Sequence, residues 1–458
     1  MDLPGLAVRQ AAATVLVRII DDGRGLDGLL DSRHGPASVN ALSDADMSLL
    51  RAIVTTACRH RGEIDYALNR LMKSRPPKNA RHLLHTLHVA AAQILFLESP
   101  DSAAVNLAVA SLKGDQRSTR FAALGNAVLR RLIRERESAS QANTTADLAR
   151  LNTPDWLFKR LRKDYGRDRA QAIATIHMLE PVIDLTVKED PQVWAQKLSG
   201  IVLRDRSLRV PKTGSITQWP GYDEGAWWIQ DAAAAVPATL LGDISGKSVA
   251  DLCAAPGGKT AQLAALGAYV TAVEQSAPRM RRLRSNLQRL GLSANCVEAD
   301  LLEWQPDAKF DAVLLDAPCS STGTIRRHPD VQWTKSAEIV TDLAKLQKAM
   351  LQRAAEFVAP GGCLVFANCS ILREEGEDIV ATLDLDALDL ALHPIEAAEV
   401  SGLEGAITKQ GTLRTLPHHL STIPSGKGLE ELGLPEDFDA QRLSGLDGFF
   451  VARFTKLA

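Results

Sequence analysis

The chain has 458 residues, and at about 150 residues per domain this length predicts about three domains. Hydrophobic residues make up 45% and charged residues 24%, which excludes a mainly disordered, coiled-coil or collagen-like chain. The net charge of −2 exerts no general attraction on a polyanion, but the charge is +5 over residues 1–150, +2 over 151–370 and −9 over 371–458. A polyanion would therefore meet the first two of these three segments.

The cysteines predict a reducing compartment and no metal centre. Their spacing matches neither a zinc site nor a dense disulfide framework. The six are Cys58, Cys253, Cys296, Cys319, Cys363 and Cys369. The first residues lack a basic start, an apolar core and a cleavage site, and no apolar run is long enough to span a membrane. We expect a cytoplasmic protein.

Residues 5–138 show helical periodicity throughout and predict an all-α domain. Two basic runs, from Arg59 to Arg81 and from Lys113 to Arg134, are candidates for RNA contact, although such groups are usually only solvated faces. Small polar residues over 139–150 suggest a linker. The predicted first domain is 1–140.

Short apolar runs over 182–230 alternate with proline and glycine turns and predict a small α/β segment, so that 141–230 is linker and small segment. From Lys247 onward, apolar strands alternate with helices, which is typical of parallel strands joined by crossovers. We predict a Rossmann-like α/β domain over 231–458. Ligands of such sheets bind at the carboxyl ends of the strands.

A glycine-rich turn follows the first of these strands and opens a helix. It reads DLCAAPGGKT, from Asp251 to Thr260. Glycines let a ligand approach the backbone, and the start of a helix offers free amides. The phosphate loop of nucleotide triphosphatases also ends in Gly-Lys-Thr, but it requires glycine where this chain has Cys253. A small ligand other than a nucleoside triphosphate is therefore favoured.

Carboxylates follow the next strands. Glu274 ends the strand after the loop and suits the ribose hydroxyls of a nucleoside, and Asp300 follows the next apolar segment. Each acid by itself is more often a cap or a surface charge. Their occurrence at successive strand ends indicates S-adenosylmethionine as the cofactor.

Two further strands end in cysteines. Cys319 follows Asp316 in the sequence DAPCSSTG, and Cys369 follows Asn368 in the sequence NCSI. A free cysteine is usually a small buried hydrophobe, but two at strand ends beside a cofactor loop favour a reactive pair.

Four stretches resemble the RNA (cytosine-C5) methyltransferases of the NOL1/NOP2/Sun type, namely DLCAAPGGKT, LLDAPCSSTGTIRRHPDVQW, FANCSILREEGEDI and LDGFFVARF. The first domain resembles NusB. The resemblance implies a methyltransferase of 16S ribosomal RNA, with Cys369 as nucleophile and Cys319 as a second cysteine associated with product release. It implies that S-adenosylmethionine is bound by Cys253, Ala254, Ala255, Pro256, Gly257, Gly258, Lys259, Glu274, Asp300 and Asp316. The family usually has Thr where this chain has Asn368, Pro at Arg373 and often Asp at Glu274.

Cytosine chemistry supplies an independent reason for a cysteine. Carbon 5 is a poor nucleophile until a thiolate adds to carbon 6, so the pKa of the thiol must fall below about 8.5, and Lys259 is a candidate for lowering it. Asp316 is a candidate acid for ring nitrogen 3. The alternatives are a transfer RNA methyltransferase, a non-catalytic assembly factor and a nucleotide triphosphatase.

The loop after Cys319 holds candidate RNA contacts, because the target base must leave its stack and phosphates must be positioned. They are Arg326, Arg327, His328 and Trp333. A structural loop with a packed tryptophan is the competing interpretation. We assign no role to residues 395–442.

Overall fold

The structure, a computed structural model, describes residues 3–31, 35–72, 76–77, 80–141, 144–211, 214–420, 434 and 438–458. Lys73, Arg75 and Lys78 of the first basic run, and most of 421–437, lie outside this set. The chain forms two compact units. The first comprises residues 1–178 and 327–336, and the second comprises 179–326 and 337–458.

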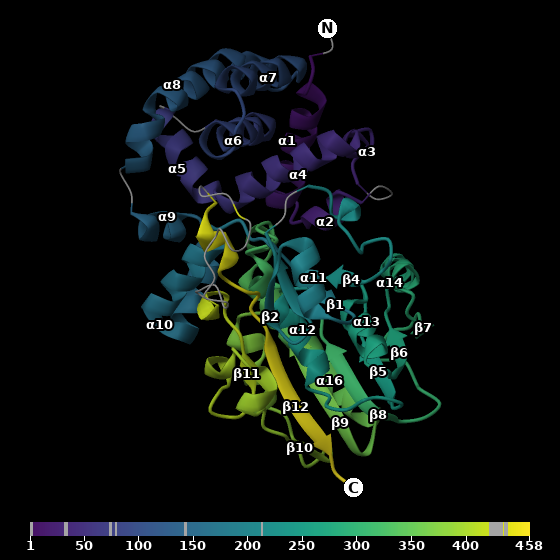
Figure 1. Cartoon of the computed structure of the whole chain (residues 1–458). Helices are drawn as coiled ribbons and strands as arrows, with labels where there is room; N and C mark the ends of the chain where they lie inside the picture. The colour runs from purple at the N-terminus through teal and green to yellow at the C-terminus, as the bar shows by residue number, and fades with distance from the viewer. Residues whose placement is uncertain are drawn as a thin grey trace. The chain divides into compact units, whose positions relative to one another are not determined.

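The first unit is entirely helical in its described part (Figure 1). Its central helix is α6, whose residues are buried on almost every side by α1, α4, α5, α7 and α8. The helices are α1 (Leu6–Ile20), α2 (Leu26–Leu29), α3 (Ala37–Asn40), α4 (Asp44–Arg59), α5 (Arg61–Leu71), α6 (Arg81–Phe96), α7 (Asp101–Gly114), η1 (Thr119–Phe121), α8 (Ala122–Gln141), α9 (Thr145–Leu151), α10 (Asp155–His177) and α15 (Val331–Thr334).

Local sequence determines where these helices begin. The Ser43 side chain accepts a hydrogen bond from the Asp46 amide at the start of α4, and Leu50, Ile53 and Val54 then form its buried stripe. The segment 139–150, expected to be a linker, is helical where it is described. Residues 139–141 end α8, and Thr144 and Asp147 cap the start of α9 reciprocally, so helix ends occupy most of this polar stretch.

The segment 327–336 belongs to the helical unit although it follows the Cys319 loop in sequence. The indole Nε1 of Trp333 donates to the carbonyl of Cys58 at 2.8 Å, and the ring packs against the helical core. Asp330 is buried and accepts from the amide of Leu26 at 2.9 Å. These contacts explain why a short excursion of the chain is ordered in this unit.

Trp333→Ala is expected to destabilise the helical unit by about 3 kcal/mol, because a packed indole and its hydrogen bond are both lost. Trp333→Phe keeps most of the packing and is expected to cost about 1 kcal/mol. Urea unfolding of the full chain measures both. Unchanged stability combined with weaker RNA binding would assign Trp333 to base stacking instead.

The second unit begins with a small antiparallel sheet in the order β2-β3-β1-β4. Two helices, α11 (Pro191–Leu198) and α12 (Ala232–Thr239), contact it. The strands are β1 (Ile183–Val187), β2 (Ile201–Arg204), β3 (Ser207–Val210) and β4 (Trp227–Ile229). Arg209 and Asp184 form a fully buried ion pair on this sheet, with Nε and Oδ1 2.7 Å apart. The carbonyl of Leu443 also accepts from Arg209, so the pair joins the sheet to the end of the chain.

The main sheet has the order β10-β12-β9-β8-β5-β6-β7, with β11 paired to β12. Strands β7, β6, β5, β8 and β9 are parallel, whereas β12 is antiparallel to β9, as Figure 1 shows. The strands are β5 (Ser248–Leu252), β6 (Tyr269–Val273), β7 (Asn295–Val297), β8 (Phe310–Asp316), β9 (Val358–Asn368), β10 (Leu390–Leu392), β11 (Leu413–Arg414) and β12 (Phe450–Lys456).

Two apolar clusters of this unit include residues from alternate positions of the strands. On β8, for example, Leu314 belongs to one cluster and Val313 to the other. The principal helices of the domain are α12 (Ala232–Thr239), α13 (Gly258–Ala265), α14 (Ala277–Leu290), α16 (Ala337–Glu356) and α17 (Glu377–Ala381). The predicted fold class is confirmed, with a helical first domain, a small sheet and a parallel α/β domain.

The domain limits at 140 and 230 remain predictions. The compact units divide after Met178, because α9 and α10 contact each other and α9 contacts α5.

Among the described residues, no helix is long and apolar enough to cross a membrane. In the same part of the chain, no three His, Cys, Asp or Glu side chains gather in a way that would hold a metal ion.

Candidate active site

The candidate site lies where the parallel strands end. Strands β8 and β9 are in register from Ala312 and Cys363 to Asp316 and Ala367. Cys319 follows β8 by three residues, and Cys369 is the first residue after β9. Parallel neighbours end at the same edge of a sheet, so both loops meet there. The Sγ atoms of the two cysteines are 3.4 Å apart.

The two thiols are not equivalent. The hydrogen bond from Cys319 lowers the pKa of the Cys369 thiol, against burial and the charge of Asp316, and the Lys259 ammonium lowers it further. For Cys319, its hydrogen bond with Cys369 and its burial raise the pKa. The site thus favours a thiolate at Cys369 and a thiol at Cys319. The thiolate is the form of cysteine that acts as a nucleophile.

Lys259 lies at the end of the glycine-rich loop, and its charge acts on Cys369. Its Nζ is 2.6 Å from Oδ2 of Asp316, and it lies over the ring of Phe449 at 5.0 Å. Burial opposes the ammonium form, but the Asp316 carboxylate outweighs it and raises the pKa of Lys259. Lys259 is therefore a fixed positive charge in the site.

The glycine-rich loop forms a cradle between β5 and α13. Gly257 has φ +102°, a conformation that a side chain rarely adopts, and Cys253 has φ +61°. An added Cβ at Gly258 would lie 3.8 Å from Gln230 and from Trp228, which is ordinary van der Waals contact. Burial raises the pKa of Cys253 to about 12, so that cysteine is not a nucleophile.

Glu274 follows β6 at the same edge and is 4% exposed. Its Oε1 accepts from the amide of Ser276, and its Oε2 lies 3.3 Å from the Arg279 guanidinium. Oε2 accepts no hydrogen bond from any residue that the structure describes, which leaves it an acceptor for a hydroxyl group. Asp300 is placed beyond β7, where it accepts from the Leu302 amide and from Gln275.

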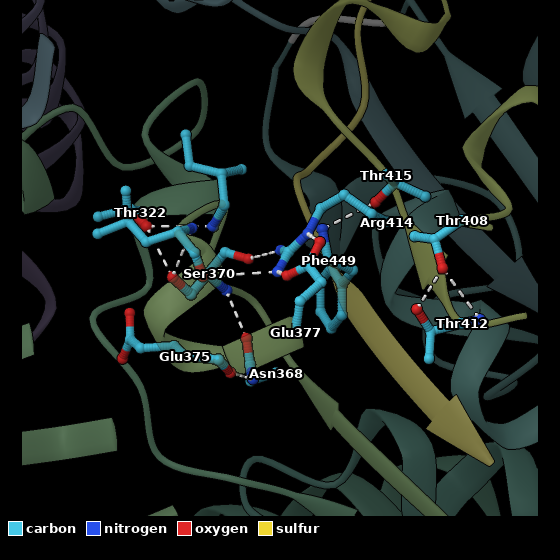
Figure 2. Close-up of polar contacts among 12 residues, drawn as sticks. Thr322, Asn368, Ser370, Glu375, Glu377, Thr408, Thr412, Arg414, Thr415 and Phe449 are labelled. Carbon is cyan, nitrogen blue, oxygen red and sulfur yellow. Dashed lines mark hydrogen bonds and ion pairs between the residues drawn. The ribbon is translucent and has the colours of Figure 1, made fainter. Parts of the chain in front are cut away.

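Buried hydroxyl groups join the two cysteine loops. Oγ1 of Thr322 lies 3.1 Å from Oγ of Ser370, as Figure 2 shows, and Ser320 bonds to both. The amide of Gly323 donates to the carbonyl of Cys369 at 2.8 Å. A Cβ at Gly323 would lie 2.7 Å from that same carbonyl oxygen, so only glycine allows this approach.

Arg414 on β11 is a site residue that sequence reasoning missed. It is 5% exposed, donates to the carbonyl of Ser370 and pairs with Glu377 at 2.6 Å (Figure 2). Part of the segment 395–442 therefore supports the Cys369 loop. The surrounding sequence, TLRTLP, has no motif that would single out this arginine.

The predicted RNA contacts are divided between the two compact units. Arg326 is 1% exposed, and its Nη2 pairs with Asp231 at 2.8 Å, so its assignment to phosphate contact is corrected to a buried ion pair. Arg327, His328 and Trp333 belong to the helical unit. Burial lowers the pKa of His328 to about 4, and Trp333 is packed as described above.

Comparison with known proteins agrees with this geometry. The family model described as 16S rRNA methyltransferase RsmB/F matches residues 238–423, and that of the NusB family matches 6–134. Ribosomal RNA small subunit methyltransferase B of Vibrio cholerae is 33% identical over 384 residues, covering 80% of this chain and 87% of the relative. The chain belongs to this methyltransferase family.

Another member of the family, from Citrobacter koseri, is 33% identical over 393 residues, covering 82% of this chain and 90% of the relative. The solved structure of PH0851 matches 99% of both chains with a TM-score of 0.73 and 22% identity, which shows a shared fold. The structure of NSun6 from Pyrococcus horikoshii covers 67% of this chain and 98% of its own, with a TM-score of 0.52 and 18% identity.

Asp251→Asn is expected to change how stability depends on pH. Burial raises the pKa of Asp251 to about 7, from about 4, although Thr260 donates to it. As pH rises from 4 to 7, the unfolded chain loses this proton while the folded chain retains it, so the free energy of unfolding falls.

The asparagine variant lacks this proton, so it should gain stability relative to the native chain across that window, by at most about 4 kcal/mol. Urea unfolding at pH 5 and pH 8 measures the difference. Asp307→Asn, at an exposed position, is the control. Parallel curves for all three proteins would contradict the assignment of a buried, protonated Asp251.

Proposed function

We propose that the chain transfers a methyl group to carbon 5 of a cytosine in 16S ribosomal RNA, with S-adenosylmethionine as the donor. The observation that carries the proposal is the pair of unequal thiols, 3.4 Å apart, beside Lys259 and Asp316. Family membership supports it, since relatives that are 33% identical over most of the chain are named ribosomal RNA small subunit methyltransferase B. A cytoplasmic location, where ribosomal RNA is found, follows from the proposal.

The thiolate of Cys369 attacks carbon 6 of the cytosine and forms a carbon–sulfur bond, which places electron density on carbon 5. Asp316 lies at the edge of the site and donates a proton to ring nitrogen 3 as the carbon–sulfur bond forms. The carboxylate that remains pairs with the Lys259 ammonium. After methylation, a general base takes the carbon 5 proton, and the electron pair of that C–H bond re-forms the double bond between carbons 5 and 6. The carbon–sulfur bond then breaks, its electron pair leaves on Cys369 as the thiolate, and nitrogen 3 returns its proton to Asp316. Cys319, in contact with that sulfur, acts in this release.

The cradle fits S-adenosylmethionine. The backbone from Cys253 to Gly258, the acceptor Oε2 of Glu274 and the carboxylate of Asp300 are the groups that would hold it. When bound, it supplies an electrophilic methyl group. Lys259 and Asp316 form the boundary between this cradle and the cysteines.

The helical unit supplies a surface for the RNA backbone. Six basic residues between the end of α7 and the middle of α8 are exposed, namely Lys113, Arg117, Arg120, Arg130, Arg131 and Arg134. Phosphate contacts position RNA without reading its sequence. We assign these side chains to docking, and the two cysteines to chemistry.

Methyl transfer to undermethylated small-subunit RNA tests the proposal. Native protein should form labelled 5-methylcytosine, Cys369→Ala should form none because no thiolate attacks carbon 6, and Cys319→Ala should accumulate a covalent protein–RNA adduct. Mapping the labelled base identifies the substrate. Transfer to transfer RNA alone would overturn the substrate, and transfer to neither RNA would indicate a non-catalytic assembly factor.

Asp316→Asn separates the acid from the cofactor cradle. We expect turnover to fall by at least a hundredfold while affinity for S-adenosylmethionine changes less than threefold, because the amide cannot exchange a proton with nitrogen 3. Single-turnover kinetics and equilibrium titration measure the two effects. Equal losses in both would restrict Asp316 to cofactor binding.

A further inference from the structure

Glu375 is a buried carboxylate that the proposed reaction does not use. It ends the short turn η4 (Arg373–Glu375), which follows the Cys369 loop, and its side chain is 0% exposed. Two donors approach Oε1, namely the amide of Ser320 at 2.8 Å and Nε2 of Gln347 at 2.9 Å. The hydroxyl of Ser320 donates to Oε2. The Glu375 side chain is the acceptor in all three hydrogen bonds, as an ionised carboxylate requires.

The partners of Glu375 adjoin both cysteines. Ser320 is the residue after Cys319, and Asn368 is the residue before Cys369. The amide Nδ2 of Asn368 donates to the carbonyl of Glu375, a contact drawn in Figure 2, and to Oε1 of Gln347 at 3.2 Å. One residue is thus bonded to the neighbour of each cysteine. A shift of Glu375 would move the two sulfur atoms relative to each other.

The charges around the sulfur atoms are unevenly placed. The hydrogen bond with Cys369 and burial raise the pKa of Cys319, and the Glu375 carboxylate, on the η4 side, raises it further. On the side of α13 and β8, Cys369 faces the Lys259 ammonium, which lowers its pKa, and the Asp316 carboxylate, which raises it. Of the two cysteines, Cys369 is influenced by both a lysine and a carboxylate, whereas Cys319 is influenced by the Glu375 carboxylate. The negative charge of Glu375 therefore favours the neutral thiol at Cys319.

We propose that Glu375 is a positioning residue that holds the two cysteine loops in contact and keeps Cys319 as the thiol donor, so that Cys369 is the nucleophile. The part of the proposal that makes Cys369 the nucleophile rests on the proposed function. The division between thiol and thiolate, however, is a property of the protein without RNA or cofactor. It can therefore be tested separately from methyl transfer.

Glu375→Gln removes the charge and nearly preserves the shape. The glutamine oxygen still accepts from the Ser320 amide and from Gln347, and its NH₂ group can donate to the Ser320 hydroxyl, which then acts as acceptor. The full-length protein is treated with iodoacetamide from pH 6 to pH 9, and labelling of Cys319 and Cys369 is measured by peptide mass spectrometry. Asp378→Asn, at an exposed position three residues further on, is the matched control.

In the native protein and in Asp378→Asn, labelling at low pH should concentrate on Cys369. In Glu375→Gln the ratio of Cys369 to Cys319 labelling should fall about tenfold, the equivalent of one pKa unit between the two thiols. A purely structural role would change the unfolding transition without changing this ratio in the folded protein. An unchanged ratio and pH profile in Glu375→Gln would overturn the proposal.

Ser320→Ala provides a second arm if Glu375→Gln does not fold. It deletes one of the three hydrogen bonds and keeps the charge, and the labelling ratio should fall by a smaller factor, about threefold. An unchanged ratio here would likewise count against positioning. If the native protein methylates no RNA and the ratio still shifts in Glu375→Gln, the proposed function fails and the assignment of Glu375 stands.

In the methylation assay, Glu375→Gln should lower kcat and leave the KM for RNA within twofold, because the substitution alters the thiols and not the docking surface. A rise in KM without a change in kcat would contradict this assignment.

Discussion

The candidate site depends on the contact between the sulfur atoms of Cys319 and Cys369. Two thiols 3.4 Å apart share one hydrogen bond, and this bond favours the thiolate on the acceptor side. The contact persists only if two loops from different strands are held together. The buried hydroxyls of Ser320, Thr322 and Ser370 and the backbone bond from Gly323 to Cys369 supply that constraint.

The strand order brings the loops of the candidate site to one edge of the sheet. Because β5, β8 and β9 are adjacent and parallel, the cofactor loop, Asp316 and both cysteines emerge at one edge of the sheet. Lys259, at the first turn of α13, bridges these groups through its ion pair with Asp316. The same lysine acts electrostatically on Cys369, so the glycine-rich loop and this cysteine are coupled through one charge.

Residues distant in sequence complete the site and its supports. Arg414 reaches the Cys369 loop from β11, and Gln347 contributes from α16. Arg326, directly after the Cys319 loop, is buried against Asp231, and the chain then enters the helical unit through 327–336. The Cys319 loop is therefore continued by a segment whose order depends on helical packing, including the bond from Trp333 to Cys58.

The sequence by itself determined the fold class, the cofactor loop and the two cysteines, because strand and helix periods and the glycine-rich turn are local signals. It also placed Glu274, Asp300 and Asp316 at strand ends. Only the tertiary structure decided which side chains share a buried environment. Arg326 and Trp333 are predicted as RNA contacts from the sequence, but both side chains are packed inside the protein. No sequence motif singles out Glu375, Gln347 or Arg414. The pairing of a buried charge depends on neighbours far along the chain, and no local pattern records them.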